Sequence, residues 1–340
     1  MSPHRLIKVT AVLISVLCLA AQVSRGETPA GKPVAANHHS SNDTATIRVD
    51  GLKKPVVVLH ITDSHISIGE QGADQYRQYI ARMDDAYGKA RPHYRTKKTA
   101  LPAEHFRELM AFARQCNVDL IALTGDIVNN PSQASVQYVC QALKDTGIRN
   151  LYISGNHDWH YEGMVGTDEA LRETWIKERL LPLYTGRDPL YSAVQLGGIN
   201  FVAIDNSTYQ VDAEQLAFYE QQVAGGLPTV LLIHIPIWLP QNAGKHVSEC
   251  GDPRWGWDTD SNYKIERRER WSKSGNSQST MDFVNRVKNT GNLIAVLAGH
   301  LHHARTDQLS ASAVQYVTQA ACDGACRLVT FEPNTSAHGK

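Results

Sequence analysis

The chain has 340 residues, 42% of them hydrophobic, and equal numbers of basic and acidic side chains, 34 of each. This length suffices to bury a sizeable core in one large domain or two average ones. The even charge balance argues against a surface built to hold nucleic acid or an anionic membrane. Fifteen histidines, several of them in short clusters, direct attention to metal chemistry.

The N-terminus has the pattern of an export signal. Arg5 and Lys8 supply a positive start, an apolar run covers residues 9–21, and polar residues follow at 24–26. This run is shorter than the roughly 20 apolar residues that span a bilayer. We therefore expect residues 1–26 to be a signal peptide and the protein to be secreted or periplasmic, with no membrane span in the mature chain. An uncleaved membrane anchor is the alternative.

Residues 27–50 are rich in Ala, Pro, Ser, Asn and His and contain almost no large apolar side chain. This composition predicts a disordered linker. We expect one domain over residues 51–333, with a loop insertion at about 241–279, and a short tail over residues 334–340.

Five cysteines follow the predicted signal peptide, so they cannot all pair within one chain. Cys322 and Cys326 are the best candidates for a bridge in an oxidising compartment. Cys116 and Cys140 fall in helix-like patterns and are expected to be buried thiols.

From residue 55 onward, short apolar runs alternate with polar loops and helical patterns. Runs rich in Val, Ile and Leu, which we interpret as buried strands, occupy residues 56–62, 120–124, 151–154, 201–204, 230–233 and 293–298. Apolar residues at helical spacing occupy 103–116, 135–146 and 168–180. Strands that alternate with helices predict an α/β domain whose sheets are covered by helices.

Two long segments interrupt this pattern, at residues 71–98 and 241–279. Long connections of this kind are usually functional, so we expect both to form walls of a pocket. Side chains that could stack on a base or clamp a phosphate occur in the second segment: His246, Arg254, Trp255, Trp257, Arg267 and Arg268. The alternative is a surface loop packed by its own aromatic side chains.

Five of the predicted strands end in residues that can bind a metal ion. These residues are Asp63 and His65, Asp126, Asn156, His234, and His300 with His302. Strand ends at one edge of an α/β sheet are where such sites are built, so we expect these side chains to converge. Each motif alone is weak, because a Gly-Asp pair or a single histidine is common in ordinary turns. The five in this order make a strong joint signal.

The ligand types also indicate the metals. Imidazole, carboxylate and one amide, without thiolate, favour Zn, Fe or Mn over an all-oxygen calcium site. One catalytic metal takes about three or four protein ligands, whereas two ions about 3.5–4 Å apart that share a carboxylate would use the whole set. Two divalent ions outweigh two carboxylates, so the site stays electropositive, as a phosphate-binding site requires.

The order Asp-x-His, Gly-Asp, Gly-Asn-His-Asp, His and Gly-His-x-His resembles the calcineurin-like metallophosphoesterase superfamily over residues 56–302. The resemblance implies a four-layer α-β-β-α sandwich, with two mixed sheets flanked by helices. It implies that a first Fe, Mn or Zn ion is held by Asp63, His65, Asp126 and His302. A second ion, bridged to the first by Asp126, would be completed by Asn156, His234 and His300. His157 matches the family's non-ligand histidine, which contacts the phosphate and can protonate the leaving group.

At several motif positions this chain differs from known subfamilies of the superfamily, which narrows the group that it resembles. His65 and Asn129 stand where purple acid phosphatases carry a glycine and a ligating tyrosine, so a tyrosinate-ligated iron is not expected. Asp158 and Trp159 follow Gly-Asn-His, where Ser/Thr protein phosphatases carry Glu and Arg. The chain is more similar to secreted or bacterial phosphodiesterases and phosphatases.

We therefore predict a phosphodiesterase or phosphatase that hydrolyses small phosphate esters by attack of a metal-bridging hydroxide. His157 would donate the proton to the leaving oxygen, a role worth about 10²–10⁴-fold in rate. Asp158 either orients His157 or stabilises the turn. The alternative function is an inactive metal-bound scaffold that binds a partner, but the intact ligand set argues against it. A nuclease would need a basic surplus that this chain lacks.

Overall fold

The apolar runs that the sequence predicts to be strands build two large sheets. The computed structural model describes residues 32–69, 74–244, 247–255 and 275–335. The first sheet has the order β1 (Ala36–Ser40), β2 (Thr44–Val49), β14 (Arg327–Pro333), β3 (Val56–Ile61), β6 (Leu120–Thr124) and β7 (Asn150–Ile153). The second has the order β12 (Arg305–Gln308), β13 (Val314–Val317), β11 (Leu293–Ala298), β10 (Thr229–Leu232), β9 (Ile199–Ile204) and β8 (Tyr191–Leu196).

Both sheets are mixed. In the first, β3, β6 and β7 run parallel, whereas β14 is antiparallel to β3 and parallel to β2. In the second, β9, β10, β11 and β13 run parallel, and β8 and β12 are antiparallel strands at the two edges. The parallel strands at the centre of each sheet therefore end at a common edge, and this edge carries the predicted metal ligands.

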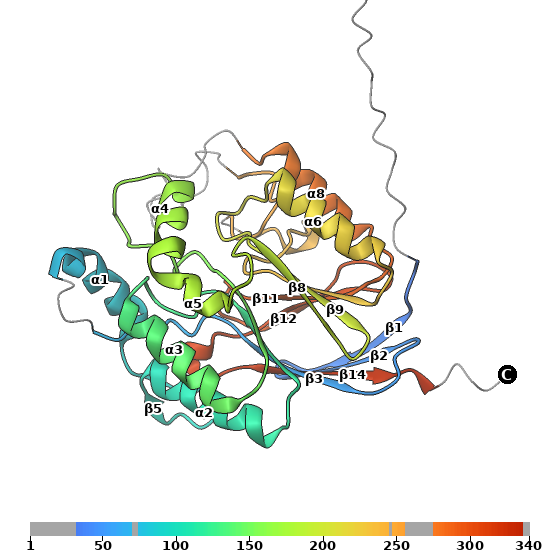
Figure 1. Ribbon diagram of the computed structural model, residues 1–340, viewed down its shortest axis with the longest axis horizontal. Coiled ribbons are helices and arrows are strands. Elements are labelled where there is room, and N and C mark those ends of the chain that lie inside the picture. The colour runs from blue at the N-terminus through green and yellow to red at the C-terminus, as the bar shows by residue number, and fades with distance from the viewer. Residues whose placement is uncertain (1–31, 70–73, 245–246, 256–274, 336–340) are drawn as a thin grey trace, which may run out of the picture.

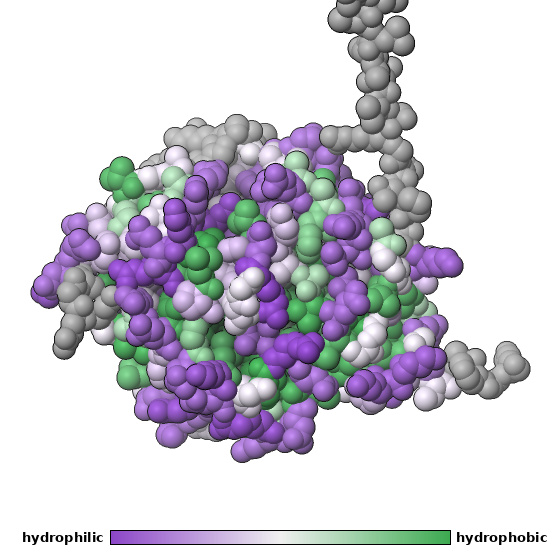
Figure 2. All heavy atoms as spheres, viewed as in Figure 1, coloured by the Kyte–Doolittle hydropathy of each residue, from purple (hydrophilic) through white to green (hydrophobic). Residues whose placement is uncertain are grey.

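Helices cover the outer face of each sheet (Figure 1). On the first sheet they are α2 (Pro102–Gln115), α3 (Gln133–Thr146), α4 (Asp168–Trp175) and α5 (Leu181–Tyr184), with the π-helical turn η3 (Ile176–Leu180) between the last two. On the second sheet they are α6 (Ala213–Ala224) and α8 (Gln278–Lys288). The surface shown in Figure 2 is largely hydrophilic, with smaller groups of hydrophobic side chains among the polar ones.

Smaller elements lie in the connections. They are η1 (Asp74–Tyr76), α1 (Arg77–Met83), the π-helical turn η2 (Asp84–Gly88), the two-stranded sheet of β4 (Arg91–Pro92) and β5 (Thr99–Ala100), η4 (Pro240–Asn242) and η6 (Ala321–Asp323).

Three hydrophobic cores fill the spaces between these layers. Val58 of β3 packs between the two sheets with Phe201 of β9, whereas its neighbour Leu59 points the other way, into the core shared with α2 and α3. A third core joins the second sheet to Phe283 of α8. Successive side chains of a strand point to opposite faces, so a strand buried on both faces reads as the continuous apolar run seen in the sequence. The predicted four-layer α-β-β-α sandwich is confirmed.

The prediction of a disordered linker over residues 27–50 is wrong for its described part. β1 and β2 lie there and form an edge of the first sheet. Ala45, Ile47 and Val49 alternate with more exposed residues and are buried between the sheets. The composition misled because β2 is stabilised by pairing with β14, which comes from the other end of the chain.

The predicted signal peptide, residues 1–26, lies outside the described residues, as do residues 336–340 of the predicted tail. Within the part of the chain that the structure describes, none of the helices combines the length and apolar character needed to cross a bilayer.

The bridge suggested between Cys322 and Cys326 is not formed, since both are free thiols, as are the other three described cysteines. Cys322 is buried in η6 with its Sγ beside the Asp323 carboxylate, while Cys326 packs under α2 in the outer core. Cys116 and Cys140, expected to be buried, are half-buried.

Candidate metal centre

The predicted ligands lie in loops that leave the carboxyl ends of five strands. Asp63 and His65 follow β3, Asp126 follows β6 and Asn156 follows β7 in the first sheet. His234 follows β10, and His300 and His302 follow β11, in the second sheet. Because these strands end at the same side of the sandwich, residues from both sheets meet in one place.

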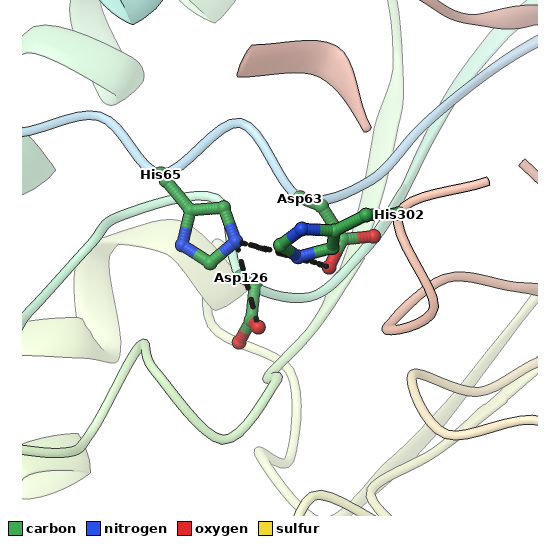
Figure 3. Close-up of side chains that lie close together, drawn as sticks. All are labelled: Asp63, His65, Asp126 and His302. Atoms are coloured by element: carbon green, nitrogen blue, oxygen red, sulfur yellow. Dashed lines mark hydrogen bonds and ion pairs between the residues drawn. The ribbon is translucent and has the colours of Figure 1, made fainter. Parts of the chain in front are cut away.

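Two overlapping groups of potential ligand atoms form there, and in each group the atoms lie within 4.8 Å of one another. The first group is Asp63, His65, Asp126 and His302 (Figure 3). The second group is Asp126, His234 and His300. Asn156 joins the second group, because its Oδ1 lies 3.2 Å from His234 Nε2. The structure thus brings all the predicted ligands together, and Asp126 is common to both groups, as a bridging carboxylate would be.

The facing atoms in the first group are close. The Nε2 atoms of His65 and His302 are 3.1 Å apart, and His302 Nε2 is 3.3 Å from Asp63 Oδ1. In the second group, His234 Nε2 is 3.3 Å from Asp126 Oδ2. Imidazole nitrogens and carboxylate oxygens that converge in this way are the donor set that Zn, Fe or Mn prefers.

Five of these residues hold left-handed backbone conformations: Asp63 (φ 53°), His65 (φ 44°), Asp126 (φ 52°), His300 (φ 69°) and His302 (φ 59°). Such a conformation costs a residue other than glycine about 1–3 kcal/mol and persists only where the surroundings impose it. It is concentrated in functional loops, so its repetition here indicates that these loops are shaped to aim side chains.

Two glycines of the motifs lie so close to a ligand carboxylate that a larger residue would not fit. A Cβ on Gly155, which precedes Asn156, would lie 2.2 Å from Asp126 Oδ1. A Cβ on Gly299, which precedes His300, would lie 2.5 Å from Asp63 Oδ2. The glycine of the Gly-Asn pair and that of the Gly-His pair thus leave the space that the neighbouring carboxylate occupies.

Hydrogen bonds outside the ligand groups orient the ligands. His234 Nδ1 lies 2.8 Å from the carbonyl oxygen of Thr124, so it donates there, and Nε2 is the nitrogen that faces Asp126 and is available to a metal. The hydroxyl of Thr62 donates to Asp63 Oδ2 at 2.7 Å. Metal-binding histidines and carboxylates are commonly held by such partners.

Tyr209 orients His300 in the way that Thr124 orients His234, by a hydrogen bond to one ring nitrogen. Its hydroxyl lies 2.6 Å from His300 Nε2, which leaves Nδ1 as the nitrogen available to a metal. The ring of Tyr209 stacks on Trp255, with centroids 4.5 Å apart and 14° between the planes. Sequence reasoning missed Tyr209, although it follows β9, the one predicted strand of the central set with no ligand assigned to its end.

Asn206, in the same loop, was also missed. Its Oδ1 accepts hydrogen bonds from the backbone N–H groups of His234 and Ile235, at 3.1 and 3.0 Å. The loop after β9 therefore supports both histidines of the second ligand group.

The two carboxylates are ionised at neutral pH. Burial alone would raise the pKa of Asp126, but His234 and His157 outweigh it and hold that pKa well below its usual value. At Asp63, too, burial alone would raise the pKa, but the nearby His302 lowers it to about 2. Burial, with the nearby His157, lowers the pKa of His65 well below its usual value, so its ring is neutral, as a ligand must be.

His157 lies beside the first ligand group without belonging to either group. Its backbone N–H donates to Asp126 Oδ1 at 2.7 Å, and its ring meets that of His65 edge-on at 4.7 Å. Its Nδ1 is buried and has no hydrogen-bond partner in the described structure. This placement suits a histidine that acts on a bound substrate.

Asp158 stabilises the turn, the second of the two roles considered for it. Its carboxylate accepts three backbone N–H groups, from Asp126, Val128 and Gly155, at 2.8, 2.9 and 2.7 Å. It therefore ties the loop after β6 to the loop after β7.

The described part of the segment 241–279 favours ordinary packing. Trp255 is buried against Tyr209, and the guanidinium of Arg254 binds the Asp252 carboxylate at 2.7 Å. The other side chains considered for substrate binding there, His246, Trp257, Arg267 and Arg268, lie outside the described residues.

The model of the calcineurin-like phosphoesterase family matches residues 56–304, which contain every predicted ligand. This chain belongs to that family. The predicted resemblance is confirmed, and the family is one of metal-dependent phosphoester hydrolases.

One relative is described as a probable cyclic nucleotide phosphodiesterase of Psychrobacter arcticus, 30% identical over 105 residues. That match covers 30% of this chain and 31% of the relative, so it spans about a third of the relative's length. Among solved structures, a dimetal phosphatase from Danio rerio has a TM-score of 0.48 at 12% identity, over 80% of this chain and 89% of that one. A purple acid phosphatase from yellow lupin (Lupinus luteus) has a TM-score of 0.47 at 12% identity, over 86% and 49%.

Proposed function

We propose that this member of the family hydrolyses small phosphoric esters with two transition-metal ions, Fe, Mn or Zn. The observation that carries the proposal is the pair of ligand groups that share Asp126. In this assignment, the first ion is held by Asp63, His65, Asp126 and His302. The second ion shares Asp126 and is held by Asn156, His234 and His300.

The residues fit such ions by their chemistry. The donors are imidazoles, carboxylates and one amide, and the carboxylates of Asp63 and Asp126 are buried with no Lys or Arg ion pair in the described structure. Buried negative charge needs a positive partner, and bound metal ions would take over the compensating role that His234 and His302 have beside these carboxylates. When bound, the two ions would lower the pKa of a water molecule and stabilise the negative charge that develops on the phosphoryl oxygens.

His157 is the proposed proton donor to the leaving oxygen. Its backbone is held by Asp126, and the turn around it is held by Asp158. Its ring lies next to the first ligand group, so a phosphate bound at that group would bring its ester oxygen within reach. Proton donation of this type is worth about 10²–10⁴-fold in rate.

Small esters are the proposed substrate class, because the equal counts of basic and acidic residues supply no surplus for tracking a nucleic-acid backbone. The relative from Psychrobacter arcticus is described as a probable cyclic nucleotide phosphodiesterase. For this reason diesters should be tested as substrates before monoesters.

Export is a further part of the proposal. It is supported by the positive start and apolar run within residues 1–26. Mass spectrometry of the protein recovered from the periplasm or the medium would find a chain that begins near residue 27. Recovery of the full-length chain in the membrane fraction would instead support an uncleaved anchor.

Metal analysis of the purified protein, with hydrolysis of nitrophenyl mono- and diesters measured alongside, tests the catalytic proposal. About two transition-metal ions per chain and activity that chelation abolishes would support it. A folded protein that holds no metal and hydrolyses neither ester after reconstitution with Mn²⁺, Zn²⁺ or Fe²⁺ would reject it and leave the scaffold alternative.

A further inference from the structure

Tyr87 lies against three histidines of the candidate metal centre. Its ring stacks on His65, with centroids 4.2 Å apart and 12° between the planes. It meets His302 at 5.1 Å and His157 at 5.3 Å, both nearly perpendicular. Tyr87 belongs to η2, in the long connection between the first and second ligand motifs, and carries no metal-binding signature in the sequence.

Polar contacts attach this turn to the ligand loops. Asp84, at the start of η2, accepts hydrogen bonds from the Ser67 hydroxyl and from Asn129 Nδ2, the latter at 3.3 Å. Ser67 lies two residues after His65, and Asn129 lies three residues after Asp126. The turn that carries Tyr87 is thus tied to both loops that supply the first ligand group.

The other end of the turn is also held. Arg91 binds the Asp323 carboxylate at 2.6 Å through Nε and reaches the carbonyl oxygen of Ala86 at 3.3 Å. The neighbouring Cys322 donates its backbone N–H to the carbonyl oxygen of Asp63 at 3.0 Å. The turn that carries Tyr87 is therefore held from two sides relative to the ligands, and a residue that contacts a substrate in a fixed geometry needs such support.

We propose that Tyr87 is a specificity residue that contacts the leaving group of the ester and favours flat aromatic leaving groups. The inference rests on the proposed function, in which His157 protonates the leaving oxygen. Because Tyr87 contacts the ring of His157, the group attached to that oxygen departs beside Tyr87. A half-buried tyrosine ring offers such a group an aromatic edge or face, and aromatic pairs are mutually attractive.

Three variants separate this role from plain packing. Tyr87→Phe keeps the ring, Tyr87→Leu keeps apolar bulk without it, and Tyr94→Leu is the matched control. Tyr94 lies in the same segment and also stacks on a histidine, His93, at 5.0 Å and 25°, but neither residue belongs to the ligand groups.

The measurement is kcat/KM of the metal-loaded protein for phenyl and methyl esters of the same phosphate. Removing the aromatic contact in Tyr87→Leu should lower the phenyl-to-methyl ratio about three- to tenfold. Tyr87→Phe and Tyr94→Leu should keep the wild-type ratio. An unchanged ratio in Tyr87→Leu, or an equal loss on both esters, would overturn the proposal.

Binding gives a readout that does not depend on turnover. Calorimetric titration with the unreactive phenylphosphonate and methylphosphonate should show the same three- to tenfold loss of phenyl preference in Tyr87→Leu, about the value of one aromatic pair. If the wild type hydrolyses no ester, the proposed function fails, but the titration still decides whether Tyr87 selects an aromatic group. Equal affinities of wild type and Tyr87→Leu for phenylphosphonate would reject that selection.

Discussion

Tyr209 shows how a residue outside the ligand groups can decide the geometry of a ligand. Its hydroxyl is hydrogen-bonded to His300 Nε2, and its own backbone is left-handed, with φ 65°. For Nδ1 to face a metal with its lone pair, Nε2 must carry the proton and donate it to the tyrosine oxygen. The second ligand group is therefore oriented by a residue outside it.

Tyr209→Phe should weaken binding of the second metal about 10- to 100-fold while the first stays bound, because His300 loses the partner that fixes its orientation. Metal titration followed by mass spectrometry would measure both affinities. Tyr219→Phe is the control, since Tyr219 is also buried and hydrogen-bonded, but to Thr290. Equal affinities for both ions in wild type and Tyr209→Phe would contradict this role.

His157 has a different relation to its neighbours, because it contacts the first ligand group but is not a member of it. Replacement by Ala should lower kcat about 10²–10⁴-fold, the usual worth of a general acid. The metal content, measured on the same sample, should stay near that of wild type. His303→Ala, at an exposed histidine near the ligands, should change neither. Loss of both ions from His157→Ala would assign His157 a structural role instead.

At the scale of elements, the two sheets are joined beneath the site by the buried His60 of β3. Its Nε2 lies 2.7 Å from the hydroxyl of Thr124, at the end of β6, and its Nδ1 lies 2.8 Å from the hydroxyl of Thr318, just after β13. Burial, with the positive charge of Arg327, lowers the pKa of His60 to about 3. The folded protein therefore keeps this ring neutral.

The pKa of His60 has a consequence for acid stability. In the unfolded chain it titrates near 6.5, so between pH 6.5 and about 3 the unfolded state binds a proton that the folded state excludes. The free energy of unfolding should thus fall with falling pH in this window, and His60 should contribute up to about 1.4 kcal/mol per pH unit.

His60→Gln should reduce that slope, since glutamine does not titrate. Urea unfolding of metal-free wild type and variant at several pH values within the window would measure it. The comparison uses slopes, so a lower absolute stability of the variant does not affect it. Parallel slopes for the two proteins would show that His60 does not titrate as expected.

At the scale of the whole molecule, the site depends on segments that are far apart in the chain. Each ligand group combines loops from the first sheet with loops from the second. A metal ion that binds the folded chain only would therefore hold the two sheets together and raise stability by mass action. The left-handed backbone at five of the ligand positions adds strain that such binding would offset.

Metal loading should accordingly raise the thermal midpoint of unfolding. At a free metal concentration about 100 times the Kd, a single site adds about 2.7 kcal/mol. Calorimetry of the protein with metal and with excess chelator would measure the difference. Asp126→Asn, which weakens the shared carboxylate, should show a smaller metal-dependent increase than wild type. Identical midpoints with metal and with chelator would exclude tight binding to the folded state.

The sequence by itself determined the central strands and the chemistry of their ends. Every apolar run predicted to be a strand forms one, because strands buried on both faces must be apolar along their whole length. The predicted ligands were recognised by residue type at those strand ends, and parallel strands bring their ends together. Their convergence could therefore be predicted without coordinates.

The tertiary structure alone decided what depends on distant pairing and on loop packing. β1 and β2 were mistaken for a linker because their burial is created by β14 and by the second sheet. Tyr87 and Tyr209 escaped notice because neither lies in a ligand motif, and only the fold places their side chains beside a histidine. Residue type reveals which atoms can bind a metal, whereas neighbours contributed by other loops depend on the three-dimensional path of the chain.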